Sequence, residues 1–499
     1  MPVWLWALAP MLLAAALVVP VLGRDILGGD ESSTLRHACA GHLGPCSPAE
    51  AIQVLLSLSP DQAWGIPILF SQWGQLVGWS EFATRALPWL AGPLTIAWVY
   101  RLGRDLFTPA IALAAAVLLS TSTLFLIYMY IARLFGPAML FTAIALWGYW
   151  RVAIAGRRPK RGGRATLLLG ATAVLYAHYF SALLVPALGL FHLFFVRKER
   201  RWWQATVLLV IAVLLALPQA PGLLAGIEFT AARGHLHSRA LQPWDVLALF
   251  FRYLSNDLLQ VPGPVAGFLL PAMVALVLWA FWNRRQRPSP PGSGWYLTLA
   301  TVLLGLLSLA ANELAQVLEH RRVRYLAGLW PPAVLLTGVV VDRLLRRSLR
   351  WLALGPVVLI AFAGVADFLW QGDLIRHNWR RRLDRATIPV VNRIALEAAP
   401  DRLLFVDPSA FGAINHSYEL YTGIWGDRRV PLYPDSLAGE LVDRARDYQD
   451  VWLLYLTVSE ASLQIPELVD ELTQIGWVGL LDWQDGQVTL QHLRSPLQK

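Results

Sequence analysis

Long hydrophobic runs dominate the first three quarters of the chain. A helix needs about 20 apolar residues to cross hydrocarbon about 30 Å thick, and runs approaching that length recur as far as residue 370. They cover residues 2–22, 87–100, 109–128, 135–151, 165–177, 180–196, 203–218, 265–281, 295–311, 325–341 and 351–370. The pattern predicts an α-helical, polytopic membrane domain over residues 1–370, with about eleven transmembrane helices.

The remainder of the chain, residues 371–499, follows a different pattern. Short apolar runs predict strands at residues 402–407, 430–433, 450–458 and 487–493. Amphipathic stretches between them predict helices at residues 435–447 and 459–475. This alternation is typical of a small, soluble α/β domain with a mostly parallel sheet. Its sequence has no phosphate-binding glycine loop, so we expect a binding or positioning role for it.

Composition supports the membrane assignment. Hydrophobic residues make up 56% of the 499 residues and charged residues only 15%, whereas soluble domains carry about 25% charge. The surplus apolar surface must therefore face lipid. The 23 tryptophans fit the same interpretation, because amphipathic rings gather at the two membrane interfaces.

The net charge of +9 belongs to the membrane part. Residues before Gly372 include 29 Lys/Arg and 15 Asp/Glu, and the remainder of the chain includes 13 Lys/Arg and 18 Asp/Glu. Much of the excess lies in short loops, as the positive-inside rule requires, and it argues against a nucleic-acid-binding protein.

The same loops predict the orientation in the membrane. Nineteen Lys/Arg lie in the loops at residues 101–107, 151–164, 197–201, 284–294 and 342–350. We therefore expect these loops and the N-terminus in the cytoplasm. The first run lacks a basic leader and a cleavage site, which favours a retained helix. An odd number of spans then leaves the C-terminal domain extracytoplasmic.

Two long segments are expected on the extracytoplasmic face, residues 24–85 and 219–264. Long loops of this kind usually carry function. The first contains both cysteines, Cys39 and Cys46. An oxidising compartment would let them pair, and two free thiols are the alternative.

Several polar residues stand at the outer ends of predicted spans: Arg133 in ARLFG, His178 and Tyr179 in AHYFS, and Arg324 and Tyr325 in RYL. Outer arginines run against the charge bias, so they need another explanation. Guanidinium groups offer paired donors to phosphate oxygens, which suggests that these residues hold a phosphate at the membrane surface. For each residue taken alone, an interfacial side chain that reaches water is the simpler interpretation.

The order of these features resembles the GT-C superfamily of membrane glycosyltransferases, in the bacterial branch related to protein O-mannosyltransferases and the lipid A aminoarabinose transferase. Asp30 and Glu31 in GGDESS match the acidic motif of that family's first outer loop. Residues 78–107, ARLFG, AHYFS and RYLAGLWPP also resemble its segments. Two features depart from the family pattern. WGIPILF replaces a Pro-Pro-Leu-Tyr-like segment, and the resemblance does not extend to the C-terminal domain.

The resemblance implies inverting transfer of a sugar from a polyprenyl-phosphate donor to a glycan, lipid or protein acceptor on the extracytoplasmic face. It implies Asp30 as the catalytic base, with Glu31 as the substitute. Arg133, Arg324 and His178 are then expected to bind the donor phosphate, with Tyr179 and Tyr325 as hydrogen-bond donors. Some relatives use a divalent metal ion, for which Glu31, His178 and His320 could supply ligands.

Two other functions fit many helices and a cationic outer face. A non-enzymatic transporter or flippase for lipid-linked sugars is the main alternative, although such proteins often show internal repeats that this sequence lacks. A membrane scaffold that displays its outer domain is the third hypothesis.

Overall fold

The computed structural model describes residues 3–23, 29–40, 46–155, 161–232, 242–256, 258, 265, 292–315, 318, 320–345, 350–370, 401–406, 429–431, 438–456, 465–485 and 488–496. The chain forms two compact units. The first comprises Met1–Leu22, Ile52–Leu69 and Arg85–Ile375, and the second comprises Gly23–Ala51, Phe70–Thr84 and Arg376–Lys499.

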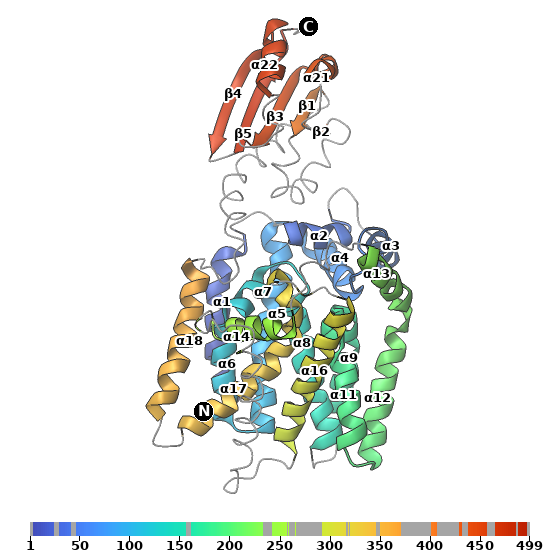
Figure 1. Cartoon of the computed structure of the whole chain (residues 1–499), viewed down its shortest axis with the longest axis vertical. Coiled ribbons are helices and arrows are strands. Elements are labelled where there is room, and N and C mark those ends of the chain that lie inside the picture. Colours follow the sequence, from blue (N-terminus) through green and yellow to red (C-terminus); the bar gives the residue numbers. More distant parts are fainter. Residues whose placement is uncertain are drawn as a thin grey trace. The chain divides into compact units, whose positions relative to one another are not determined.

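Helices build the first unit (Figure 1). In chain order they are η1 (Val3–Ala7), α1 (Leu8–Val18), η2 (Val19–Val21), α6 (Pro109–Ser120), α7 (Thr123–Tyr130), α8 (Phe135–Tyr149), η4 (Trp150–Ile154), α9 (Arg161–Ala177), α10 (Tyr179–Ala182), α11 (Leu184–Phe195), α12 (Arg200–Ala216), η5 (Leu217–Gln219), α13 (Ala220–Ala232), α14 (Pro243–Leu254), α16 (Ser293–Ala315), η7 (His320–Leu329), α17 (Trp330–Leu345) and α18 (Arg350–Trp370). Three further helices have residues in both units: α3 (Pro48–Leu58), α4 (Gly65–Val77) and α5 (Glu81–Leu106).

Four helical segments in the described part of the chain are long and apolar enough to cross a membrane. They are Phe135–Ile154, Arg200–Phe229, Ser293–Glu313 and Arg324–Arg343, and the bent pair α6 and α7 makes a fifth if it counts as one span. The helical membrane fold is as expected, but the described residues contain four or five spans of full length rather than the predicted number of about eleven.

Shorter helices account for part of this difference. The run at residues 180–196 is divided at Leu183 between α10 and α11. The run at residues 265–281 lies almost wholly outside the described residues. Hydrophobicity predicted where apolar helices occur, but local breaks decide how long each one is.

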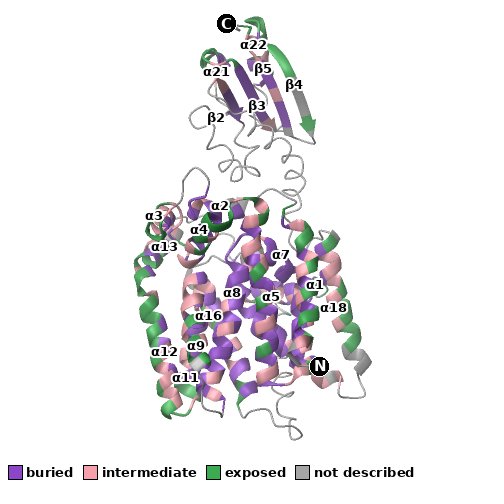
Figure 2. Ribbon diagram, turned by 180° about the vertical axis from the view of Figure 1, so that it is seen from behind, coloured by how far each residue is buried: buried purple, intermediate pink, exposed green. Residues whose placement is uncertain are grey.

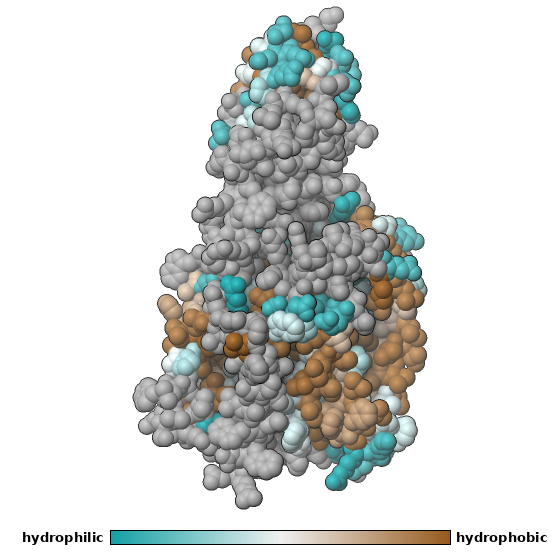
Figure 3. Space-filling model, in the orientation of Figure 1, coloured by the Kyte–Doolittle hydropathy of each residue, from teal (hydrophilic) through white to brown (hydrophobic). Residues whose placement is uncertain are grey.

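Burial separates the centre of the first unit from its lipid-facing side. The span that contains α8 is 78% buried, whereas the span of α12 and α13 is only 22% buried. Figure 2 shows this contrast in the two helices. The surface over α12 and its neighbours is continuously apolar, with a hydrophilic patch at the end where α12 begins (Figure 3). This pattern is the one expected for a helix that faces lipid.

Small residues let α8 and α9 approach closely. A Cβ at Gly148 would lie 2.5 Å from the backbone nitrogen of Leu167, and one at Gly170 would lie 2.7 Å from that of Ala145. Membrane helices often pack through such residues, because lipid supplies little hydrophobic drive for helix association.

A break between α6 and α7 bends the chain by 65°. Such a break exposes backbone groups that cannot be left unsatisfied inside a membrane protein. The side chain of Asn256 supplies partners here. Its Oδ1 accepts the N–H of Thr123 at 3.0 Å, and its Nδ2 donates to the carbonyl of Ile360 on α18 at 2.8 Å. Asn256 therefore fixes the start of α7, a helix whose eight residues are all buried.

We expect Asn256→Ala to destabilise the protein by about 1 to 3 kcal/mol, because it leaves a buried donor and acceptor unsatisfied. Thermal unfolding of the purified protein in detergent would measure this change. Asn256 has a φ of 49°, so Asn256→Gly is the matched variant: it removes the same hydrogen bonds without the cost of a positive φ. An Ala variant as stable as the wild type would contradict this role.

The second unit contains α2 (Gly29–His37) and a five-stranded sheet of order β2-β1-β3-β5-β4. The strands are β1 (Arg402–Val406), β2 (Arg429–Pro431), β3 (Asp450–Leu456), β4 (Val478–Asp485) and β5 (Val488–Arg494). Two helices accompany them, α21 (Ala438–Ala445) and α22 (Ile465–Gln474). Their buried residues form one core with Leu403, Phe405, Val451 and Leu453.

The α/β prediction for this sheet is confirmed, with two corrections. β4 was not predicted, and the sheet is mixed rather than mostly parallel. β1 pairs in parallel with β2 and β3, whereas β5 pairs antiparallel with β3 and β4. β4 is an edge strand that exposes Val478 and Leu480, and its partner follows directly as the second arm of a hairpin.

A disulfide joins Cys39 and Cys46, which confirms their expected pairing. The side chain of Gln75 on α4 donates to the carbonyl of Cys46 at 2.8 Å. After the disulfide, Ser47 and Glu50 cap the start of α3 reciprocally, each side chain accepting the other residue's backbone N–H. The covalent link and the capping box together fix the entry into α3.

Candidate functional site

Arg133 lies in a short turn between two buried helices. α7 ends at Tyr130, Ile131 is extended, and α8 begins at Phe135 with a proline in its first turn. The N–H of Arg133 donates to the carbonyl of Ile131 at 2.7 Å. Only 7% of Arg133 is exposed. A guanidinium at this depth is costly without compensating contacts, so its position is unlike that of a side chain reaching water.

His178 occupies a second break, between α9 and α10. Its backbone is extended, and its carbonyl accepts the N–H of Ala182 at 2.8 Å, which starts α10. The hydroxyl of Ser181 lies 3.5 Å from Nδ1 of the imidazole. A Cβ at Gly328 would lie 3.0 Å from the same hydroxyl, so η7 passes close to this turn.

η7 brings Arg324 and Tyr325 to these two breaks. The ring of Tyr325 lies 5.0 Å from that of His178 and 6.0 Å from that of Phe135, measured between centroids. The guanidinium of Arg324 lies 5.6 Å from the centroid of Phe135. Phe180 completes the group, 5.8 Å from Tyr325. Aromatic rings thus hold one guanidinium and the imidazole in fixed positions.

Charge and burial set the protonation state of this group. Burial lowers the pKa of His178 to about 3, and the nearby guanidiniums of Arg133 and Arg324 add to the effect. The imidazole is therefore neutral at neutral pH, with one N–H available as a donor. Arg133, His178 and Arg324 come from three separate parts of the chain, and we call them the Arg-His-Arg cluster.

Tyr179 contacts a different part of the first unit. Its hydroxyl donates to the carbonyl of Gln62 at 3.2 Å. The structure thus brings together Arg133, His178, Arg324 and Tyr325, and it joins Tyr179 to the segment before α4.

The two acidic candidates belong to the second unit. Asp30 and Glu31 are in α2, where Glu31 is buried, and the side chain of Asp30 lies outside the described residues. Among the described side chains, no group of three or more His, Cys, Asp or Glu could hold a metal ion. The side chain of His320 is also outside the described residues.

Arg85 is a buried cation to which the sequence pattern assigned no role. Its guanidinium lies 5.9 Å from the ring centroid of Tyr130 and donates to the carbonyl of Leu22 at 3.2 Å. Arg85 therefore joins α5 to the end of the first helix and to α7. The available signal was the Arg-x-x-Pro pattern of Arg85 to Pro88, which lies inside the segment at residues 78–107 that resembles the family.

The lowered pKa of His178 predicts a loss of stability in acid. The unfolded state binds a proton below about pH 6.5 and the folded state only near 3, so folding stability falls by about 1.4 kcal/mol per pH unit between these values. His178→Gln removes this titration. The stability difference between wild type and variant should shrink by about 2 kcal/mol from pH 7.5 to pH 5. Equal differences at both pH values would contradict a buried, neutral His178.

One protein family matches part of the chain in sequence. Residues 61–224 match the family described as dolichyl-phosphate-mannose-protein mannosyltransferase. This segment includes α4 to α12, and hence Arg133 and His178. A search of curated proteins finds no match.

Solved structures share the fold. ArnT from Cupriavidus metallidurans bound to undecaprenyl phosphate is 13% identical, with a TM-score of 0.61 over 98% of each chain. The structure of ArnT in the apo state has a TM-score of 0.59, and the match covers 98% of this chain and 97% of ArnT. The arabinofuranosyltransferase AftD from Mycobacteria is 15% identical, with a TM-score of 0.51, and the match covers 99% of this chain but 40% of AftD. The shared fold and the family match confirm that this chain resembles the GT-C superfamily of membrane glycosyltransferases related to ArnT and the protein mannosyltransferases.

Proposed function

We propose that this protein transfers a sugar from a polyprenyl-phosphate donor to an acceptor on the extracytoplasmic face of the membrane, with inversion at the anomeric carbon. The observation that carries the proposal is the Arg-His-Arg cluster, which places two guanidiniums near a neutral imidazole. The GT-C fold supports it, as does the undecaprenyl phosphate bound to ArnT, which has the same fold.

The cluster has the chemistry that a departing phosphate needs. When the bond between the anomeric carbon and the phosphate oxygen breaks, the carrier phosphate gains negative charge. Guanidinium groups stabilise that charge through bidentate hydrogen bonds. The N–H of neutral His178 and the hydroxyl of Tyr325 are further donors, and neither requires a proton to be taken up at neutral pH.

The fixed backbone around the cluster favours this role. Arg133 and His178 each occupy a turn between two helices, and Phe135, whose ring contacts that of His178, belongs to α8, the most buried of the long apolar helices among the described residues. Donors held in place before the reaction do not have to reorganise as charge develops, which is where electrostatic catalysis gains most.

The acceptor side of the reaction requires a base. We assign it to Asp30, with Glu31 as the substitute, because the resemblance places the family's acidic motif at these residues. The base takes the proton of the acceptor hydroxyl as its oxygen attacks the anomeric carbon on the face opposite the phosphate. The products are the glycosylated acceptor, which can be a glycan, lipid or protein, and polyprenyl phosphate.

The proposed orientation has the N-terminus in the cytoplasm and residues 371–499 extracytoplasmic. Positive charge in the loops supports it. The cluster lies at the start of α8 and the end of α9, the helix ends opposite the basic loops at residues 151–164.

If the cluster holds the donor phosphate, Arg133→Ala and Arg324→Ala should each weaken binding of polyprenyl phosphate by roughly 1.5 to 3 kcal/mol. Arg133→Lys should recover part of the loss, because lysine keeps the charge but not the paired donors. Direct binding to the purified protein is the measurement. Arg200→Ala, at the exposed start of α12, is the control and should bind normally. Wild-type affinity in both Ala variants would place the phosphate elsewhere.

Asp30→Asn should abolish sugar transfer while donor binding persists. The amide keeps the shape of the carboxylate but cannot take the acceptor's proton, and a general base accounts for about a hundredfold to ten-thousandfold in rate. Single-turnover transfer from a polyprenyl-phosphate sugar is the measurement. Glu31→Gln is the paired variant: normal transfer by Asp30→Asn with none by Glu31→Gln would move the base by one residue.

The transfer assay, together with a transport assay in vesicles, separates the proposal from the transporter hypothesis. If both carboxamide variants transfer sugar at the wild-type rate, the acidic motif is not the catalytic base. If the wild type moves lipid-linked sugar across a vesicle membrane without transferring it, the protein is a flippase.

A further inference from the structure

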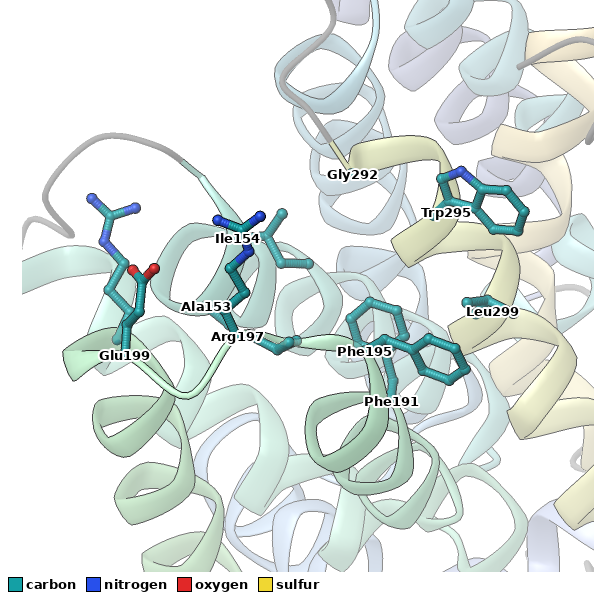
Figure 4. A pocket seen from close by; sticks show the side chains of 11 residues that line it. Ala153, Ile154, Phe191, Phe195, Arg197, Glu199, Gly292, Trp295 and Leu299 are labelled. Atoms are coloured by element: carbon teal, nitrogen blue, oxygen red, sulfur yellow. The ribbon is translucent and has the colours of Figure 1, made fainter. Parts of the chain in front are cut away.

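A cavity of about 590 Å³ lies at the end of α8 opposite Arg133. η4, the loop between α11 and α12, and the start of α16 surround it (Figure 4). The span that links the two ends of α8 has 20 residues, so this cavity and the Arg-His-Arg cluster are about 30 Å apart. The cavity therefore belongs to a different membrane surface and plays no part in the proposed transfer.

One side of the cavity is aromatic. Phe191 is buried, and its ring stacks 5.7 Å from that of Phe195. Phe195 and Trp295 also line the cavity and are 58% and 53% exposed. Exposed rings of this size at the end of a membrane helix lie where acyl chains meet the interface. This side can therefore bind hydrocarbon.

The other side is charged. Arg197, Glu199 and Arg201 line it. Nη1 of Arg201 donates to the carbonyl of Ala155 at 2.5 Å. That carbonyl is presented by the π-helical turn η4, where the N–H of Ala155 bonds five residues back to Trp150 at 2.8 Å. The π turn thus orients the guanidinium of Arg201 in advance.

The charge balance selects one class of ligand. Two guanidiniums and one carboxylate leave a single net positive charge, which complements one phosphodiester better than the dianion of a phosphomonoester. Basic pockets between transmembrane helices at the cytoplasmic surface are suited to anionic lipid headgroups. The adjoining surface of α12 is apolar and open to lipid (Figure 3), so the acyl chains would have a continuous path.

We propose that this cavity binds the headgroup of an anionic glycerophospholipid from the leaflet opposite the Arg-His-Arg cluster. Arg197 and Arg201 hold the phosphodiester, and Phe191, Phe195 and Trp295 pack against the first methylenes of the acyl chains. The proposal concerns lipid binding and is independent of the sugar transfer.

Native mass spectrometry of the full chain in detergent, titrated with phosphatidylglycerol, tests this site. Arg197→Gln should weaken the tightest lipid-binding event about tenfold, the scale of one charge-assisted hydrogen bond. Lys198→Gln is the matched control, because Lys198 is exposed in the same loop but does not line the cavity. It should change affinity by less than about twofold.

Arg201→Gln should weaken lipid binding by a similar factor. Because this variant also loses the hydrogen bond to Ala155, it could misfold. Arg197→Gln keeps that bond and changes an exposed side chain, so a loss of lipid binding in Arg197→Gln cannot be attributed to misfolding. Equal losses in Arg197→Gln and Lys198→Gln would reduce the effect to general surface charge and overturn the proposal.

Competing ligands decide the chemistry of the site. Added phosphatidylglycerol should displace the bound phosphatidylglycerol, whereas phosphatidylcholine and inorganic phosphate should not displace it. Trp295→Ala should weaken the lipid but leave any inorganic phosphate unaffected. Displacement by inorganic phosphate alone would make this a soluble-anion site. Stronger displacement by polyprenyl phosphate than by phosphatidylglycerol would assign it to the carrier, and either result would overturn the glycerophospholipid assignment.

Discussion

The membrane unit depends on holding two arginines where charge is expensive. Arg133 is almost fully buried, and with Arg324 it lies near the imidazole of His178, which stays neutral chiefly because it is buried, with the two positive charges adding to the effect. Such an arrangement stabilises the folded protein poorly by itself, so the surrounding helices must enforce it. In return it offers fixed donors to an anion, and this is the property that the departing polyprenyl phosphate of the proposed reaction requires.

Breaks in helices are the means by which the fold presents these groups. Arg133 follows the short helix α7, whose start is fixed by Asn256, and His178 separates α9 from α10. A continuous helix would satisfy its backbone hydrogen bonds internally, but its side chains could reach a ligand only from the side of the helix and not from its end. Each break costs backbone hydrogen bonds, which other side chains and carbonyls replace. The stability of α18 and α14 is thereby linked to the geometry of the cluster through Asn256.

The two ends of α8 contact different parts of the first unit. Its first residue, Phe135, packs against Arg324, Tyr325 and His178. Its last turn widens into η4 and presents the carbonyl of Ala155 to Arg201. Between them the glycines Gly148 and Gly170 hold α9 close. One helix therefore connects the proposed phosphate site at its start to the proposed lipid cavity at its end.

The sequence by itself determined what depends on local pattern: apolar helices, the small α/β domain, the paired cysteines, and the outer-end arginines as candidates. Hydrophobic runs, alternation and charge placement are properties of neighbouring residues, so they are readable without a fold. Only the tertiary structure decided which candidates meet. Arg133, His178 and Arg324 are far apart in the chain and join through η7, whereas Tyr179, beside His178, bonds to Gln62 instead. The break at Ser122 and the role of Asn256 were likewise beyond the pattern, because each is set by contacts between residues distant in sequence.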